Sequence, residues 1–323
     1  MRRGLLVPLL ALALLPPAAI VIARAAGEDT ARGFTWIRSA QRPKLQRTEV
    51  AGAVLGKDIY VIGGFVPPRR TTSAVERLRR DHWTRTRSLP VALNHAAAVG
   101  YRDHVYVAGG YASPDGLGQP VKTLYRYDPK QDRWTRLPDM PTARAALALG
   151  ASGGQLYAVG GSNGAKQTGV LEIYDIARRR WSRGPSLAVA REHLGGAVYR
   201  GRFYAVAGRN NADGNLAIVE SYDRATRRWS RLPDMPKERG GNGAAVLGGS
   251  LVAVGGEEAG GTIGEVDLFD FASRTWARIA PMPTPRHGLA VVATPSGTVW
   301  AVAGGPQPGM AFSNAAELLR PRD

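Results

Sequence analysis

The chain has 323 residues, of which 44% are hydrophobic and 21% are charged. This share of apolar residues is enough to bury a large core, which excludes a disordered or low-complexity chain. The 40 glycines exceed the usual fraction and favour a fold with many tight turns. The absence of cysteine excludes disulfide bonds, thiolate metal sites and cysteine nucleophiles. With 43 Lys and Arg against 26 Asp and Glu, the formal net charge is +17.

Residues 1–25 have the layout of a secretory signal peptide. A basic start, Met1-Arg2-Arg3, precedes an apolar run from Leu5 to Ala23, and Ala23-Arg24-Ala25 fits a small-residue cleavage site. We therefore expect an exported protein, periplasmic or secreted, with residues 26–33 as a linker. The apolar run is also long enough to cross a bilayer if it is not cleaved, so an N-terminal membrane anchor is the alternative.

The spacing of the tryptophans indicates the architecture. Six of them recur at intervals of 47, 51, 47, 48 and 47 residues: Trp36, Trp83, Trp134, Trp181, Trp229 and Trp276. Each interval repeats an apolar run of small residues, a second run that ends in a glycine pair, and a third run that in four of the five intervals ends in an aromatic-Asp pair such as Tyr127-Asp128. Short strand-like runs separated by Gly-rich turns, four in each repeat, predict four-stranded blades.

The two ends of the chain complete the count of blades. The last copy has its glycine pair at Gly304-Gly305 and stops after Leu319 without a tryptophan, whereas Trp36 has no blade before it. If residues 34–38 supply the outer strand of the last blade, every blade has four strands and no sheet edge is left open. The sequence therefore predicts an all-β, six-bladed propeller over residues 34–323, closed by an N-terminal strand.

On these residues, the chain resembles the kelch-repeat β-propellers. The glycine pair, the Tyr-Asp and the spaced Trp are the motif of that family, and the resemblance covers nearly all of residues 34–323. Blade 1 has Leu78-Arg79 and blade 6 has Leu319-Arg320 in place of Tyr-Asp, which we interpret as worn copies. Features that occur in every blade are best explained by the blade itself. This applies to the glycine pairs, the tryptophans and the repeated acids Glu76, Glu172, Glu220, Asp267 and Glu317, which we expect to be hydrogen-bonding groups.

A repeated arginine carries the main binding hypothesis. It precedes the inner strand in five blades, and we place Asn94 at the sixth position: Arg47, Asn94, Arg144, Arg191, Arg239 and Arg286. A ring of guanidinium groups around one mouth of the channel would suit a carboxylate, sulfate or phosphate. In kelch domains that bind acidic peptides, arginines of this kind line the mouth. The alternative is structural, with each arginine paired to one of the repeated acids.

The loops that follow the glycine pairs differ from blade to blade. They begin at Phe65, Tyr111, Ser162, Arg209, Glu257 and Pro306, and we expect them to open on one face. Aromatic side chains at Phe65 and Tyr111 beside the arginines, together with Arg209, are further candidate ligand-binding residues.

We expect no metal and no cofactor. His95, His193 and His287 lie near the inner strands of alternate blades, but we interpret His193 as one residue out of phase, so that it faces away from the other two. No phosphate-binding loop, zinc-protease motif or calcium loop occurs in the sequence.

Two enzyme classes are suggested by the resemblance. Copper oxidases similar to galactose oxidase need a cysteine for their cofactor, and this chain has none. A sugar-acid epimerase or mutarotase similar to N-acetylneuraminate epimerase needs a carboxylate-binding arginine and an acid/base group. Candidate pairs are Arg47 with Glu49, Arg191 with Glu192, or Glu257 with Glu258. No motif identifies a catalytic residue.

The binding module is the preferred interpretation, because fold alone does not define an activity. Its expected partner is an anionic small molecule such as a sugar acid, or an acidic protein segment. We expect a monomer, no nucleic-acid partner, and at most weak contact of the basic surface turns with an anionic membrane or polysaccharide.

Overall fold

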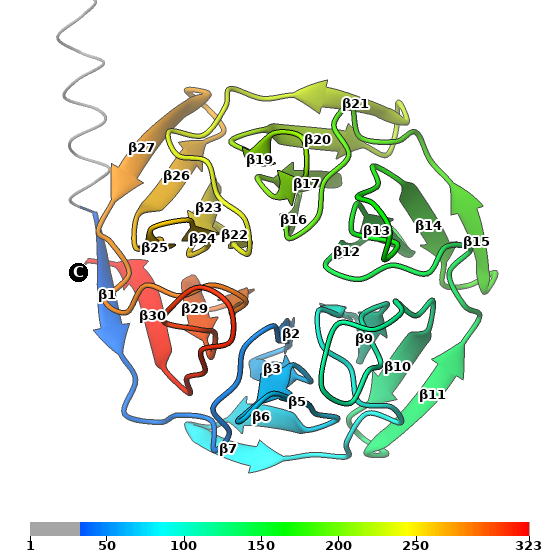
Figure 1. The fold of residues 1–323 in the computed structure, drawn as a ribbon. Coiled ribbons are helices and arrows are strands. Elements are labelled where there is room, and N and C mark those ends of the chain that lie inside the picture. The colour runs from blue at the N-terminus through cyan, green and yellow to red at the C-terminus, as the bar shows by residue number, and fades with distance from the viewer. Residues whose placement is uncertain (1–32, 323) are drawn as a thin grey trace, which may run out of the picture.

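A computed structural model describes residues 33–322 of the chain. These residues form six four-stranded antiparallel sheets arranged as blades around a central axis (Figure 1). The all-β, six-bladed propeller predicted from the repeats is therefore confirmed. Within residues 33–322, no helix has the length and apolar character needed to cross a membrane. The predicted signal peptide and most of the predicted linker lie outside the described residues.

The strands follow the same order in every blade, from the axis outward. Blades 1 to 3 are built from β2 (Ala51–Leu55), β3 (Asp58–Ile62), β6 (Val75–Arg79) and β7 (His82–Arg85); β8 (Ala97–Tyr101), β9 (His104–Ala108), β10 (Leu124–Asp128) and β11 (Arg133–Leu137); and β12 (Ala148–Ser152), β13 (Gln155–Val159), β14 (Leu171–Asp175) and β15 (Arg180–Arg183). Blades 4 to 6 are built from β16 (Gly195–Tyr199), β17 (Arg202–Val206), β20 (Val219–Asp223) and β21 (Arg228–Arg231); β22 (Gly243–Leu247), β23 (Ser250–Val254), β26 (Val266–Asp270) and β27 (Thr275–Ile279); and β28 (Ala290–Thr294), β29 (Thr298–Val302), β30 (Ala316–Pro321) and β1 (Phe34–Arg38).

Blade 6 contains both ends of the described chain. Strand β1 pairs antiparallel with β30, in a register that sets Phe34 opposite Pro321 and Arg38 opposite Glu317. Trp36 thereby takes the outer-strand position that the other tryptophans hold in their own blades. The predicted closure by an N-terminal strand is confirmed, and it removes the edge that β30 would otherwise expose.

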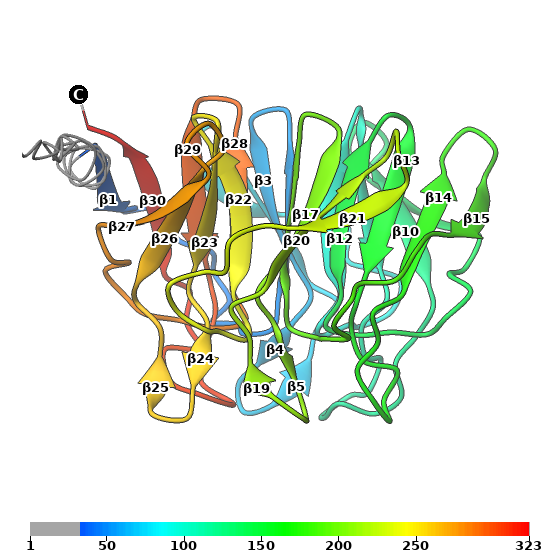
Figure 2. The same cartoon turned by 90° about the horizontal axis from the view of Figure 1, so that it is seen from above.

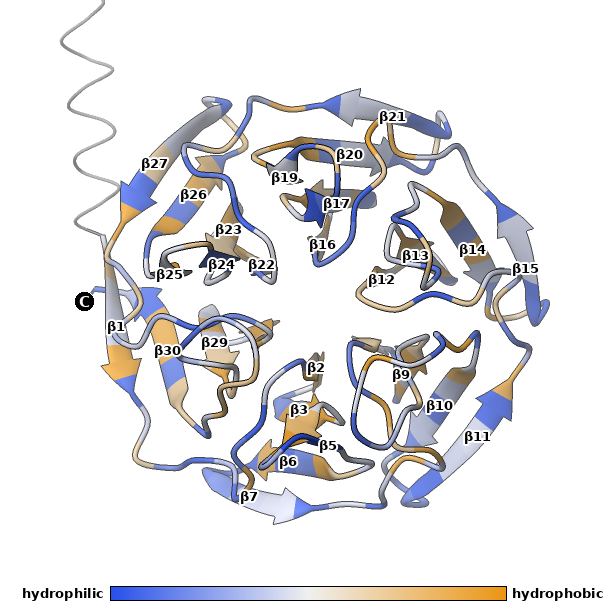
Figure 3. Ribbon diagram, viewed as in Figure 1, coloured by the Kyte–Doolittle hydropathy of each residue, from blue (hydrophilic) through white to orange (hydrophobic). Residues whose placement is uncertain are grey.

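The hydrophobic core is divided among the junctions between blades. Each of the six clusters of buried apolar residues draws its members from two neighbouring blades, including the junction between blades 6 and 1. Figure 3 shows the corresponding pattern, with apolar residues concentrated on middle strands such as β3 and β9 and polar residues on outer strands such as β11. Burial of apolar area at each junction therefore holds the blades in the ring.

The tryptophans also link neighbouring blades through hydrogen bonds. Trp134 Nε1 donates to the carbonyl of Arg87 at 2.9 Å, and Trp181 Nε1 donates to that of Pro138 at 2.8 Å. The same bond recurs from Trp229, Trp276 and Trp36 to Pro185, Pro233 and Ala280. Trp83 Nε1 is the exception in the described chain, because it is buried without a hydrogen-bond partner.

The glycine pairs bring the middle strand of a blade back to its inner strand. Gly63 and Gly64 have φ values of 60° and 90°, a region that side chains rarely adopt. A Cβ on Gly64 would lie 2.5 Å from the carbonyl oxygen of Thr48, so the space is also closed to a side chain.

The loops after the glycine pairs contain three short hairpins. These are β4 (Phe65–Val66) with β5 (Arg70–Thr71), β18 (Arg209–Asn210) with β19 (Gly214–Asn215), and β24 (Glu257–Glu258) with β25 (Gly261–Thr262). In side view they project from the same end of the propeller (Figure 2). We call this end the loop face.

Candidate functional site

The start of each inner strand has a repeated set of backbone contacts. In each blade, a glycine at the end of the second strand donates its N–H to a backbone carbonyl just before the inner strand of the next blade, and in five of the six cases the acceptor is the repeated arginine. The acceptors are Leu93, Arg144, Arg191, Arg239, Arg286 and Arg47. Leu93, rather than Asn94, therefore occupies the arginine position of blade 2, which corrects the sequence assignment.

Blade 6 needs a similar correction. In blade 6, the N–H group that donates to the carbonyl of Arg47 belongs to Gly304. The two residues with positive φ are Ala303 and Gly304, at 59° and 95°. Gly305 then bridges to His287, as Phe65 bridges to Thr48 in blade 1. The pair is therefore Ala303-Gly304, and the loop begins at Gly305 instead of Pro306.

The five arginines do not line the mouth of the channel. The side chains of Arg47, Arg144, Arg191, Arg239 and Arg286 are fully buried. Each forms an ion pair with the repeated acid of its own blade, for example Arg144 with Glu172 at 2.9 Å and Arg47 with Glu76 at 2.7 Å. Other N–H groups of the guanidinium ends donate to backbone carbonyls, as Arg144 Nη1 does to Gly160 at 2.7 Å. The expected ring of exposed guanidinium groups is therefore corrected to the structural alternative, because the blade itself supplies the counter-charges.

The polar groups at the axis come from the position two residues after the arginine. These six residues are Glu49, His95, Ala146, His193, Gly241 and Gly288. All have φ between 52° and 70°. Backbone hydrogen bonds join them around the channel, with His95 N–H donating to Glu49 and Ala146 N–H to His95. Three of the six blades therefore direct a chemically active side chain to the axis, and the other three leave space there.

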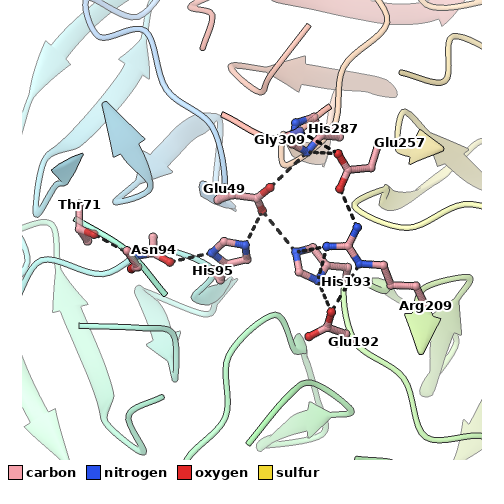
Figure 4. A network of polar contacts seen from close by, with 11 residues as sticks. Glu49, Thr71, Asn94, His95, Glu192, His193, Arg209, Glu257, His287 and Gly309 are labelled. Atoms are coloured by element: carbon pink, nitrogen blue, oxygen red, sulfur yellow. Dashed lines mark hydrogen bonds and ion pairs between the residues drawn. The ribbon is translucent and has the colours of Figure 1, made fainter. Parts of the chain in front are cut away.

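Glu49 is the centre of this network (Figure 4). Its Oε2 lies 3.3 Å from His95 Nε2 and 3.9 Å from His193 Nε2, and its Oε1 lies 3.2 Å from His287 Nδ1. Only 10% of the Glu49 side chain is exposed. Beside it is a cavity of about 90 Å³, lined also by Ala146, Gly241 and Gly288.

The network perturbs the ionisation of its members. Burial opposes ionisation of Glu49, but the neighbouring imidazoles of His95, His287 and His193 outweigh burial and lower the pKa of Glu49. Burial lowers the pKa of His95 to about 4, against the opposing effect of Glu49. Burial also disfavours the charged form of His287, but its contacts with Glu49 and Glu257 raise its pKa. Such paired and opposed shifts are common at functional sites.

Arg209 is the one predicted arginine that reaches this network. It starts hairpin β18–β19 and its side chain is 33% exposed. Its Nη1 donates to Glu257 at 2.7 Å, and its Nε lies 3.4 Å from Glu192. Its Nη2 is 3.3 Å from His193 Nε2. We call Glu49, His95, Glu192, His193, Arg209, Glu257 and His287 the axial cluster.

The other predicted binding residues support the cluster from within. Phe65 and Tyr111 are buried, which corrects the expectation of exposed aromatic side chains. Their rings contact that of His95 edge to face, with centroids 5.9 Å and 5.6 Å away. Asn94 is also fully buried and its Oδ1 lies 2.7 Å from His95 Nδ1. These three side chains therefore fix the orientation of the imidazole.

The axial cluster covers the loop-face end of an apolar channel. Further along the inner strands, a cavity of about 350 Å³ is lined by small and apolar residues of all six blades, among them Gly52, Ala98 and Val198. A polar ligand that approaches from the loop face would meet the cluster before this apolar segment.

Comparison with known proteins agrees with this architecture. The model of the kelch motif matches residues 92–141, 143–188, 190–236 and 238–283, which is more than half of the chain. The chain belongs to the kelch-repeat family. A solved structure, described as the structure of YjhT, aligns with 85% of this chain and 95% of its own, with a TM-score of 0.71 at 16% identity. At that identity the likeness concerns the fold alone.

Curated relatives match a smaller part of this kelch protein. The Kelch repeat and BTB domain-containing protein 1 of Cowpox virus (strain Brighton Red) is 30% identical over 122 residues, which are 38% of this chain and 22% of the viral protein. Alpha-scruin of Limulus polyphemus is 31% identical over 119 residues, 34% of this chain and 13% of its own. The chain thus spans less than a quarter of either relative.

The sequence interpretation missed the centre of the site because of a register error. His95 and His193 are equivalent residues, and His287 is the one offset by a position, bridging like Asn94 and Glu192. An alignment of the blades with Leu93 at the arginine position of blade 2 would have placed Glu49, His95 and His193 at equivalent positions, two residues after that position.

Proposed function

We propose that this kelch propeller is a recognition module that binds a small polar ligand at the loop face, over the axial cluster. The observation that supports it most is the position of Arg209. The five repeated arginines form buried ion pairs, whereas Arg209 is partly exposed and lies beside carboxylates and imidazoles at the axis. Concave sites with a few convergent polar groups and shifted pKa values are typical of ligand pockets.

The charges of the cluster favour a sugar acid over an acidic peptide. Arg209 can donate to a carboxylate, and Glu192 and Glu257 can accept from sugar hydroxyls. A peptide with several carboxylates would instead meet the repulsion of Glu49, Glu192 and Glu257 and would offer few donors. The proposed ligand class is therefore a molecule with one carboxylate and several hydroxyl groups.

Isothermal titration calorimetry with matched ligands tests this proposal. A sugar acid, the neutral parent sugar and a short acidic peptide would be titrated into the protein. We expect saturable binding of the sugar acid, lost in Arg209→Gln and retained in Arg231→Gln. Arg231 is a matched control because it is an exposed arginine on outer strand β21 that also forms an ion pair, with Asp234. Equal binding of the neutral sugar, or an unchanged Arg209→Gln variant, would contradict the proposal.

A sugar-acid epimerase or mutarotase is the second candidate. It is favoured by acid/base groups next to the arginine, since Arg209 contacts both Glu257 and His193. General acid/base catalysis needs such groups within hydrogen-bond reach of the substrate. Proton NMR of a freshly dissolved sugar-acid anomer tests this activity. Faster anomer exchange with the parent protein than with Arg209→Gln would support an enzyme. Exchange at only the spontaneous rate would exclude this activity and favour the binding module.

We also propose that the protein is exported. This proposal is supported by the basic start, apolar run and small residues of residues 1–25. N-terminal sequencing of protein recovered outside the cytoplasm tests it. A start at Ala26 supports cleavage, and an intact N-terminus in the membrane fraction supports the anchor instead.

A further inference from the structure

We propose that Glu49, His95 and His193 bind one divalent transition-metal ion on the propeller axis. Each residue offers one ligand atom, and these three atoms all lie within 4.8 Å of one another. The three residues come from equivalent positions of blades 1, 2 and 4, where the ring of backbone hydrogen bonds fixes their main chains. This inference does not rest on the proposed ligand.

The distances suit a metal with imidazole and carboxylate ligands. Bonds of about 2.0–2.1 Å in tetrahedral geometry put ligand atoms roughly 3.3–3.4 Å apart. The distance from Glu49 Oε2 to His95 Nε2 is 3.3 Å, and that to His193 Nε2 is 3.9 Å. The first distance already fits such a site, whereas Glu49 and His193, and the two imidazoles, would have to move closer together around the ion.

The hydrogen bonds of His95 prepare its Nε2 as a ligand. Asn94 Nδ2 donates to Thr71 Oγ1 at 2.9 Å and to the carbonyl of Gly116 at 3.2 Å, which directs Asn94 Oδ1 toward the ring. Because Oδ1 is an acceptor 2.7 Å from His95 Nδ1, the neutral imidazole carries its proton on Nδ1. The Nε2 lone pair then faces the Glu49 carboxylate, and a cation between these two acceptors would satisfy both.

His193 has the same arrangement with a different partner. Its Nδ1 lies 3.2 Å from Glu192 Oε1, which orients the ring and leaves Nε2 toward Glu49. A carboxylate or carbonyl behind a metal-binding histidine fixes the tautomer and raises the basicity of the ligand nitrogen. Both imidazoles thus have an outer-shell acceptor.

The charge balance of the axial cluster also favours a dication. Glu49, Glu192 and Glu257 contribute three carboxylates against the single guanidinium group of Arg209, so acidic groups outnumber the permanent cation at the axis. The 1% exposed His287 places its Nδ1 3.2 Å from Glu49 Oε1 and 3.4 Å from Glu257 Oε2, beside the same carboxylates. A divalent ion would neutralise the excess acid.

The site has space for a further ligand of the metal. Ala146, Gly241 and Gly288 occupy the other three equivalent positions and line the cavity of about 90 Å³. Three protein ligands with an open fourth position are typical of zinc sites that bind water or substrate. Two imidazoles with one carboxylate favour Zn²⁺, Co²⁺ or Fe²⁺ over Mg²⁺ and Ca²⁺, which prefer oxygen ligands.

Arg209 is the group that opposes the metal. Its Nη2 lies 3.3 Å from His193 Nε2 and would have to turn away when a cation binds. The bond to Glu257 and the partial exposure of the side chain allow this movement without burying a free charge.

The test uses chelator-treated whole protein titrated with Zn²⁺ by calorimetry and with Co²⁺ by visible absorption. We expect one ion per chain and a Co²⁺ spectrum of low coordination number with nitrogen ligands. Glu49→Gln, His95→Gln and His193→Gln should each weaken binding by more than 100-fold. Outer-shell variants Asn94→Ala and Glu192→Gln should weaken it by about 10–100-fold. His82→Gln with His104→Gln, which removes the two histidines outside the cluster, is the control and should bind as the parent does.

Several outcomes would overturn the site. The absence of saturable Zn²⁺ and Co²⁺ binding by the parent protein would do so, and this readout does not depend on the folding of any variant. Binding that survives in folded His95→Gln and His193→Gln but disappears in the His82/His104 control would assign the metal to surface imidazoles. Loss of sugar-acid binding would leave the metal result unaffected, because Zn²⁺ and Co²⁺ are titrated alone.

Discussion

Leu93 and Tyr125 lie in one hydrophobic cluster at the junction of blades 1 and 2, at the two positions where every other blade has an arginine and a carboxylate. Loss of one partner from a buried ion pair leaves an uncompensated charge, whereas replacement of both by apolar residues is often close to neutral. Blade 2 has both replacements together. The buried ion pairs of the other blades therefore have a structural role in the blade and are not ligand-binding groups.

The pair of blade 3 tests this conclusion. Arg144→Leu should lower the free energy of unfolding by about 3–5 kcal/mol, because Glu172 is then buried without its counter-charge. Arg144→Leu combined with Glu172→Tyr reproduces blade 2 and should recover a large part of that loss. Denaturant unfolding of both variants measures the effect. A double variant that is less stable than Arg144→Leu would show that the pair itself is required.

The tryptophan hydrogen bonds give a comparison within the same chain. Trp181→Phe removes the bond from Trp181 Nε1 to Pro138, which should cost about 1 kcal/mol in addition to the lost ring area. Trp83→Phe loses ring area but no hydrogen bond, because Trp83 Nε1 has no partner. Because the Trp83 ring is the more buried of the two, at 7% exposed, the loss in each variant is compared with that expected from its own ring area, and only Trp181→Phe should exceed it in thermal unfolding. A loss in Trp181→Phe that its ring area alone explains would indicate that the bond contributes nothing net.

Asp132 should contribute a pH-dependent part of the stability. The Tyr127 hydroxyl donates to its carboxylate at 2.5 Å and the Arg87 N–H donates at 2.9 Å, and these bonds lower the pKa of Asp132. The contribution is present above the unfolded pKa of about 3.9 and is lost as the pH falls through the lower folded value. The melting-temperature difference between the parent and Asp132→Asn should therefore shrink on acidification below about pH 4. A constant difference would contradict this assignment.

Arg209 should have opposite effects on the two proposed ligands. Arg209→Gln removes a cation 3.3 Å from His193 Nε2, so Zn²⁺ binding should tighten severalfold. The same change removes the donor proposed for a sugar carboxylate, so sugar-acid binding should weaken. Calorimetry of both ligands on one preparation measures the two signs. A change of both affinities in the same direction would indicate general damage to the axial cluster.

The fold could be predicted from the sequence because its information is repeated. Each blade must fill the same junctions, so the spacing of Trp134 and Trp181 and the glycine pairs encode the ring several times over. Even the closure by β1 follows from the missing tryptophan of the last copy, and it is confirmed.

The site could not be predicted in the same way, because it depends on differences between blades. One misplaced residue, Asn94 for Leu93, hid the equivalence of His95 and His193. Burial of Phe65 and Tyr111 depends on how adjacent loops fold over the axis, and residue type does not reveal it. The joint loss of arginine and acid in blade 2 was the one sequence signal for the structural role of the buried pairs.

The pairing of β1 with β30 also determines how the ring responds to mechanical force. In this antiparallel register, Phe34 and Pro321 lie opposite each other at the end of the strand pair from which both termini leave. A pull on the two ends would load the first hydrogen bonds of the ladder before the others, because the bonds run perpendicular to the strands. The ring would open by peeling along one seam, with the five remaining blades still intact.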